Sequence, residues 1–178
     1  MSRLPQIGRR GLLLGVGACL SGCGFRPVYA PTSKLAGGAQ TELGAVDVGI
    51  IPDRGGQLLR QSLQERLDRG GLAEAKRYDL TVSFGLSVAG LGIQSDSTIT
   101  RLRLVGTGTW SLKRLDPGRT LVTSGVARSL DGFNVLDQQY FAADMENESA
   151  QRRIADALAE QITLQIASYF SRHAQTAG

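Results

Sequence analysis

The chain is poor in the residues most often used for catalysis and metal binding. Its 178 residues include two cysteines, one histidine and one tryptophan, and aromatic residues make up 6%. The histidine, His173, lies close to the C-terminus, where side chains are usually solvated. No His, Cys, Asp or Glu cluster has metal-ligand spacing, and no glycine-rich phosphate loop precedes a helix. The composition predicts that the protein is not an enzyme and that it holds no metal or cofactor.

Apolar runs are scarce as well, and the pronounced one spans residues 11–22 (GLLLGVGACLSG). It is too short to cross a bilayer, and it follows residues 1–10, which carry three arginines and no acid. A basic segment, a short apolar segment and small residues are typical of a secretory signal. Leu20-Ser21-Gly22-Cys23 resembles the bacterial lipobox, whose cysteine is acylated. We therefore predict a signal peptide over residues 1–22 and lipidation, with palmitate among the acyl chains, at Cys23.

Two details of this signal leave alternatives. Cys19 also follows small residues and is a second candidate acceptor for the lipid, although Leu20-Ser21-Gly22 fits the lipobox better and makes Cys23 the preferred one. Arg9-Arg10 before the apolar run also resembles a twin-arginine signal. The surrounding residues match that signal poorly, so general secretion is the preferred route.

Removal of the signal also removes most of the basic excess. The whole chain has 20 basic and 16 acidic residues, and without Arg3, Arg9 and Arg10 the balance is 17 against 16. A net charge near +1 gives no support for nucleic-acid binding. Cys23 is then the one remaining cysteine, which excludes a disulfide within the mature chain.

The mature chain divides into a linker and one domain. Residues 23–44 are rich in proline and glycine and poor in large apolar groups, which predicts a lipidated N-terminus and an extended, flexible linker. Residues 45–178 are long enough for a single core, and they are expected to form one periplasmic α+β domain.

The pattern of apolar residues predicts the elements of this domain. Period-two alternation predicts strands over 45–51, 80–88, 101–112 and 120–129, the last two joined by a turn at Pro117-Gly118. Leucines four residues apart predict a helix ending near Gly70-Gly71. A longer helix is expected to begin between Asp144 and Ser149. Its apolar stripe consists of Ile154, Leu158, Ile162, Ile166 and Phe170.

The resulting order is β-α-β-β-β-α. Consecutive strands with short connections favour an antiparallel meander. We therefore expect a two-layer α+β sandwich, in which both helices cover one face of a mostly antiparallel four-stranded sheet. Gly106-Thr107-Gly108 lies inside one strand, where glycines mark a bulge or a close backbone approach.

Basic residues are the candidate ligand-binding groups. Arg101 and Arg103 alternate with Leu102 and Leu104, which places them on the free face of the sheet. Guanidinium groups match phosphate oxygens well, so this face is suited to an anionic glycolipid; the alternative is that the charges only solvate the sheet. The candidate contacts are Arg101, Arg103, Lys113, Arg114 and Arg119.

Several short motifs accompany the lipobox and the element order. These motifs are Cys23-Gly24-Phe25-Arg26-Pro27-Val28-Tyr29, Pro52-Asp53-Arg54, Gly56-Gln57-Leu58-Leu59-Arg60, Tyr78-Asp79-Leu80, Thr100-Arg101, Tyr140-Phe141-Ala142, Arg152-Arg153 and Tyr169-Phe170. With these features the chain resembles the LPS-assembly lipoprotein LptE family in its alphaproteobacterial form, and the resemblance covers most of the mature chain.

The resemblance implies a periplasm-facing lipoprotein of the outer membrane, and Gly24 after the cysteine agrees with that sorting. It further implies a plug inside an LptD-like β-barrel, a role in assembling that barrel, and delivery of lipopolysaccharide to the outer leaflet. The expected partners are the barrel, lipopolysaccharide and the membrane, with no nucleic acid. Two alternatives stay open: an auxiliary lipoprotein of another envelope lipid-transport or secretion machine, and a tethered periplasmic enzyme.

Overall fold

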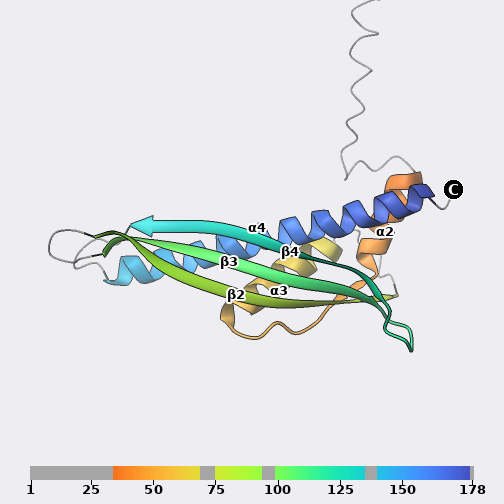
Figure 1. Cartoon of the computed structure of the whole chain (residues 1–178), viewed down its shortest axis with the longest axis horizontal. Helices are drawn as coiled ribbons and strands as arrows, with labels where there is room; N and C mark the ends of the chain where they lie inside the picture. The colour runs from red at the N-terminus through yellow and green to blue at the C-terminus, as the bar shows by residue number, and fades with distance from the viewer. Residues whose placement is uncertain (1–33, 69–74, 94–98, 135–139, 177–178) are drawn as a thin grey trace, which may run out of the picture. The chain divides into compact units, whose positions relative to one another are not determined.

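The computed structural model describes residues 34–68, 75–93, 99–134 and 140–176 (Figure 1). These residues form an α+β domain with a four-stranded sheet and three helices, which confirms the predicted fold class. The elements are α2 (Lys34–Gly44), β1 (Val46–Val48), α3 (Arg54–Leu67), β2 (Tyr78–Ile93), β3 (Ile99–Arg114), β4 (Leu121–Asn134) and α4 (Tyr140–Thr176).

The sheet has the strand order β1-β2-β3-β4. Strands β2, β3 and β4 form the predicted antiparallel meander, whereas β1 pairs parallel to β2, with Val46 opposite Tyr78. The sheet is therefore mixed, because α3 returns the chain so that β2 starts in the same direction as β1.

The strands of the meander are longer than the sequence predicted. The pairing of β2 and β3 runs from Tyr78 opposite Arg114 to Ile93 opposite Ile99. Alternation of apolar residues fades after Val88 because glycines replace side chains there, although the backbone pairing continues. The ladder between β3 and β4 has a register shift between Leu112 and Lys113.

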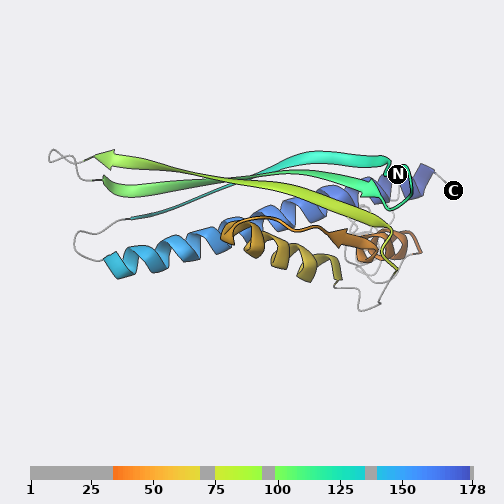
Figure 2. The same ribbon diagram turned by 90° about the horizontal axis from the view of Figure 1, so that it is seen from below.

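One face of the sheet carries the core, and Figure 2 shows the helices gathered on that side. Helix α4 packs along β3 and β4, and α3 packs against α4. The predicted stripe on α4 is confirmed, since each of its five members is at most 6% exposed. The buried side chains that the sheet contributes to the same core include Leu80, Val82, Leu104, Trp110 and Leu112.

The two glycines in the middle of β3 allow α4 to lie close to the strand. A Cβ at Gly106 would lie 2.3 Å from Cγ2 of Ile154, and a Cβ at Gly108 would lie 3.5 Å from Cδ1 of Ile162. The ladders on both sides run through these glycines without a shift. Of the two predicted roles, the close backbone approach is confirmed and the bulge is not.

The end of the predicted linker differs in the structure, because residues 34–44 form helix α2. Ala39 and Leu43 lie one helical turn apart and are both 5% exposed. Helix α2 packs against α4, so burial of this small apolar face outweighs the low helix propensity of Gly37 and Gly38. The apolar pattern within residues 34–44 is too short to predict this contact with α4 from the sequence.

None of the described helices is long and apolar enough to cross a membrane. The predicted signal peptide and the candidate lipid acceptors Cys19 and Cys23 lie outside the described residues. Helix α4 begins at Tyr140, a turn earlier than the earliest predicted start.

An ion cluster joins the N-terminus of α3 to α4. Glu148 accepts hydrogen bonds from Arg54 and Arg152, and these bonds lower the pKa of Glu148 below its ordinary value. A carboxylate with a lowered pKa stabilises the fold at neutral pH, and this stabilisation disappears as the pH falls through the folded-state value.

We expect Glu148→Gln to lower the unfolding temperature at pH 7. The difference from wild type should shrink as the pH falls through the lowered pKa of Glu148, because the wild-type carboxylate then becomes protonated as well. Thermal unfolding followed by circular dichroism between pH 7 and pH 3 measures this difference. A difference that stays constant over that range would show that the charge of Glu148 is not responsible.

Candidate functional site

The five predicted basic residues fall into two groups at opposite ends of β3. Arg101 and Arg103 lie near its start, and Lys113 and Arg114 lie at its end, followed by Arg119 in the turn to β4. Ten residues separate Arg103 from Lys113, which corresponds to about 33 Å of extended strand. The structure therefore does not bring the five residues together into one site.

Arg101 and Arg103 lie on the open face of the sheet, as predicted. Both are exposed, whereas Leu104 between the same strands is fully buried on the helical side. Arg101 lies opposite Asn134 and Arg103 lies opposite Gly132 on β4. Within the described part of the chain neither arginine has an ion-pair partner, so both guanidinium groups are available to an anion.

A third arginine, Arg128, lies on the same face and was not among the predicted contacts. It is exposed on β4 opposite Thr107, about four residues along the sheet from Arg103. Its face could not be assigned from the sequence because Ser124, Gly125 and Ser129 weaken the alternation of this strand. One signal in the sequence points to this face, namely the alternation around Arg128, in which the small residues Gly125 and Ala127 face the helix.

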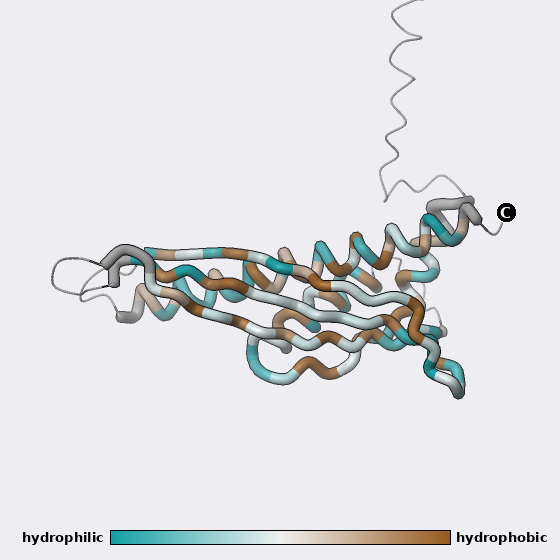
Figure 3. Tube along the Cα trace, in the orientation of Figure 1, coloured by the Kyte–Doolittle hydropathy of each residue, from teal (hydrophilic) through white to brown (hydrophobic). Residues whose placement is uncertain are grey.

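Exposed aliphatic side chains flank Arg128 on this face. Val126 and Leu130 precede and follow it by two residues and are 57% and 62% exposed. The pairing of Val126 with Thr109 and of Leu130 with Val105 confirms that these side chains point away from the helices. Figure 3 shows the mixture of apolar and polar residues along the three long strands. We call Arg101, Arg103, Val126, Arg128 and Leu130 the outer-face site.

In the second basic group one member is already paired, and the other two lie on opposite faces of the sheet. Arg119 forms an ion pair with Asp79, and Lys113 lies opposite the same aspartate in the ladder between β2 and β3. Arg114 lies opposite Tyr78 on the other face, so it is separated from Lys113 by the sheet itself. These three residues are poorer candidates for a shared anion site than the arginines at the other end.

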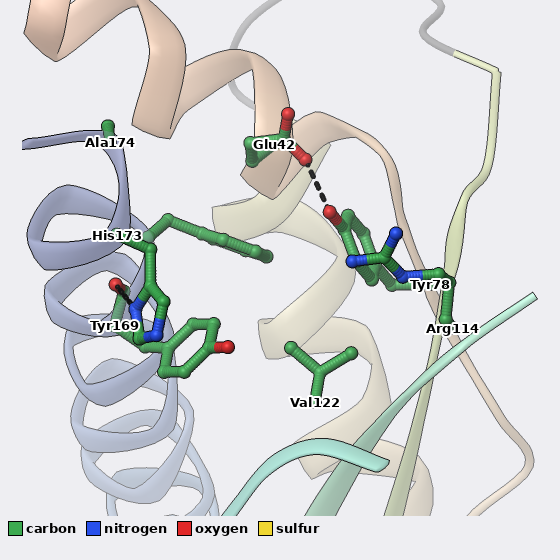
Figure 4. Close-up of a pocket in the computed structure, with 8 residues that line it drawn as sticks. Glu42, Tyr78, Arg114, Val122, Tyr169, His173 and Ala174 are labelled. Atoms are coloured by element: carbon green, nitrogen blue, oxygen red, sulfur yellow. Dashed lines mark hydrogen bonds between the residues drawn. The ribbon is translucent and has the colours of Figure 1, made fainter. Parts of the chain in front are cut away.

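Arg114 lines a pocket of about 280 Å³ between the end of the sheet, α2 and α4 (Figure 4). The Tyr78 hydroxyl donates a hydrogen bond of 2.8 Å to Oε2 of Glu42. Burial, followed by this hydrogen bond, raises the pKa of Tyr78.

His173 is exposed, and its ring stacks on Tyr169 at a centroid distance of 3.9 Å. The described residues contain no group of three or more His, Cys, Asp or Glu arranged for a metal ion.

Comparison with solved structures finds the same fold in bacterial lipoproteins. A lipoprotein from Caulobacter crescentus is 25% identical, with a TM-score of 0.60, covering 76% of this chain and 97% of that chain. The minor lipoprotein from Acinetobacter baumannii is 19% identical, with a TM-score of 0.56 and coverages of 69% and 90%. Rare lipoprotein B from Shewanella oneidensis is 14% identical, with a TM-score of 0.54 and coverages of 69% and 93%.

No curated protein matches the chain closely enough to be counted as a relative. The model of the LptE family, described as lipopolysaccharide-assembly, matches residues 43–166. This match covers more than half of the chain and includes every described strand, α3 and most of α4. The chain therefore belongs to the LptE lipopolysaccharide-assembly family.

Proposed function

We propose that this protein is an outer-membrane lipoprotein, anchored through Cys23, that serves as the plug subunit of an LptD-like barrel. In this role it assists assembly of the barrel and delivers lipopolysaccharide to the outer leaflet. Membership of the LptE family supports the role, and the lipobox supports the anchor. The scarcity of residues that commonly serve in catalysis or metal binding supports a protein that acts by binding.

The outer-face site is the feature of the structure that supports lipopolysaccharide as the ligand. Lipopolysaccharide has phosphate groups on a sugar backbone with acyl chains attached. Guanidinium groups pair with phosphate, and exposed aliphatic side chains contact acyl chains. Arg128 with Val126 and Leu130 on either side places both kinds of group on one open face.

The double variant Arg101→Asp/Arg103→Asp tests this assignment. We expect it to weaken binding of purified lipopolysaccharide about tenfold or more, because each charge-assisted hydrogen bond contributes about 1.5–3 kcal/mol. Surface plasmon resonance on the mature domain measures the affinity. Co-purification with the barrel should stay unchanged, because the substitutions do not touch the core.

Lys113→Asp/Arg114→Asp is the matched control, since it changes the charge equally at the other end of the same strand. We expect a smaller effect from this control. Unchanged binding of the first variant at moderate salt would assign Arg101 and Arg103 to solvation of the sheet.

The plug role has a separate test in the affinity purification of the wild-type protein from native outer membranes. Stable co-purification with a large barrel supports it. A free monomer in detergent would refute it, and capture of an inner-membrane transporter instead would favour an auxiliary lipoprotein of another transport machine.

A further inference from the structure

The two edges of the sheet differ in how their backbone groups are satisfied. At the β4 edge, Gln161 mimics a neighbouring strand: Oε1 accepts from the Arg128 amide at 3.3 Å, and Nε2 donates to the Arg128 carbonyl at 3.1 Å. Gln165 donates to the Val126 carbonyl at 3.3 Å and accepts from Nε1 of Trp110. Helix α4 therefore closes part of this edge with side-chain amides.

The β2 edge is closed only at its start. Strand β1 pairs with Tyr78, Asp79 and Leu80, and the Gly49 amide donates to the Leu80 carbonyl at 3.0 Å. Since backbone groups alternate along a strand, the amides and carbonyls of the following even-numbered residues point to the same side as those of Leu80. Among the described residues none bonds to them, and Figure 1 shows β2 as the outermost long strand there. These residues are Val82, Phe84, Leu86 and Val88.

The composition of this edge does nothing to prevent pairing. The stretch Leu80–Ile93 contains no charged residue and no proline, the two devices that usually protect an edge strand. Helix α3 covers the strand at Phe84, which a Cβ on Gly55 would contact at 2.6 Å. Beyond that point Val88, on the helical side, is 56% exposed. A long, uncharged edge of this kind is a template for pairing with another strand.

We infer that the edge from Val82 to Val88 binds an extended, uncharged segment of the barrel partner, which adds to the sheet as a fifth strand. The inference rests on the proposed function for the identity of the partner. The edge offers no counter-charge, so a charged segment would be desolvated without compensation. A bound strand would lay apolar side chains beside Leu86 and Val88, and small polar ones beside Ser83 and Ser87.

A second copy of this chain suits the edge less well. The cluster of Arg54, Glu148 and Arg152 carries a net positive charge and lies at the N-terminus of α3, next to the residue that contacts Phe84. Two copies joined through β2 would bring two such clusters to the same side of the joined sheet, which like-charge repulsion disfavours.

Val88→Pro tests the inference, because proline removes the amide that faces the open edge and leaves the bonds to β3 in place. Ser124→Pro is the matched control. Its amide points to the same side of β4 as that of Arg128, away from β3, and the side chains of Val88 and Ser124 are both exposed. Thermal unfolding of both variants checks that they fold, and Val88→Lys replaces Val88→Pro if the proline variant does not.

The probe is the LptD barrel of the same organism, co-expressed with the full chain. We expect Val88→Pro to lower the amount of co-purified barrel about tenfold, the effect of about 1.4 kcal/mol, and Ser124→Pro to leave it unchanged. Hydrogen exchange should slow at the four edge amides of β2 when the barrel is bound.

Wild-type yield of the complex with Val88→Pro, together with unchanged exchange, would overturn the inference and leave the proposed function standing. A wild-type chain that forms no complex with the barrel would instead overturn the proposed function and this inference with it. A wild-type dimer by light scattering that Val88→Pro dissociates would assign the edge to a second copy, against the inference.

Discussion

Replacement of Cys23 by serine is expected to move nearly all of the protein from the membrane fraction to the soluble periplasmic fraction. A serine hydroxyl does not take the place of the acylated thiol, and the resemblance to bacterial lipoproteins implies an anchor of three acyl chains. Each buried methylene contributes about 0.8 kcal/mol, so three chains hold the protein almost permanently and their loss releases it. Membrane fractionation and mass spectrometry of the mature N-terminus measure the outcome.

The chain supplies its own control in Cys19→Ser, which changes the other candidate acceptor four residues earlier. This variant should remain lipidated and membrane-bound. If instead Cys19→Ser releases the protein and Cys23→Ser does not, the cleavage site lies before Cys19 and the predicted boundary is wrong.

Gly106→Ala is expected to destabilise the domain by about 1–3 kcal/mol, although it adds a single methyl group. The new Cβ would lie 2.3 Å from Cγ2 of Ile154 and 3.3 Å from Cδ1 of Leu158, both on the fully buried stripe of α4. Ile154 is β-branched and has little rotamer freedom in a helix, so relief requires that α4 move away from the sheet. Denaturant unfolding of the mature domain measures the loss.

Gly85→Ala is the matched control on the open face, because a Cβ there would meet no atom within 4 Å. It should leave the stability unchanged or raise it slightly, since alanine restricts the unfolded chain. The double variant Gly106→Ala/Ile154→Ala should lose less stability than the sum of the losses of the two single variants, because alanine at position 154 leaves room for the new methyl group. Strict additivity would show that the clash is not the cause.

Much of the fold follows from local patterns in the sequence. Alternation in Leu80–Val88 identified β2, and the four-residue repeat from Ile154 to Phe170 identified the buried stripe of α4. These predictions succeeded because a side chain's face is determined by its position along its own element. The same reasoning placed Arg101 and Arg103 on the open face of the sheet.

The missed features depend on contacts between distant segments. Helix α2 forms because Ala39 and Leu43 bury against α4, more than a hundred residues away in the sequence. Arg128 joins the outer-face site only through the register of β4 on β3. The split of the basic residues also depends on the length of β3, which carries Arg101 and Lys113 to opposite ends of the sheet.

The sequence by itself therefore determined the α+β class and which faces of the long elements are apolar, and it predicts the signal peptide and the lipidation, because each depends on near neighbours in the chain. Only the tertiary structure decided which arginines share a face and which edge of the sheet remains open. Both depend on strand register and on where α4 lies, and these are set by packing between residues far apart in the sequence.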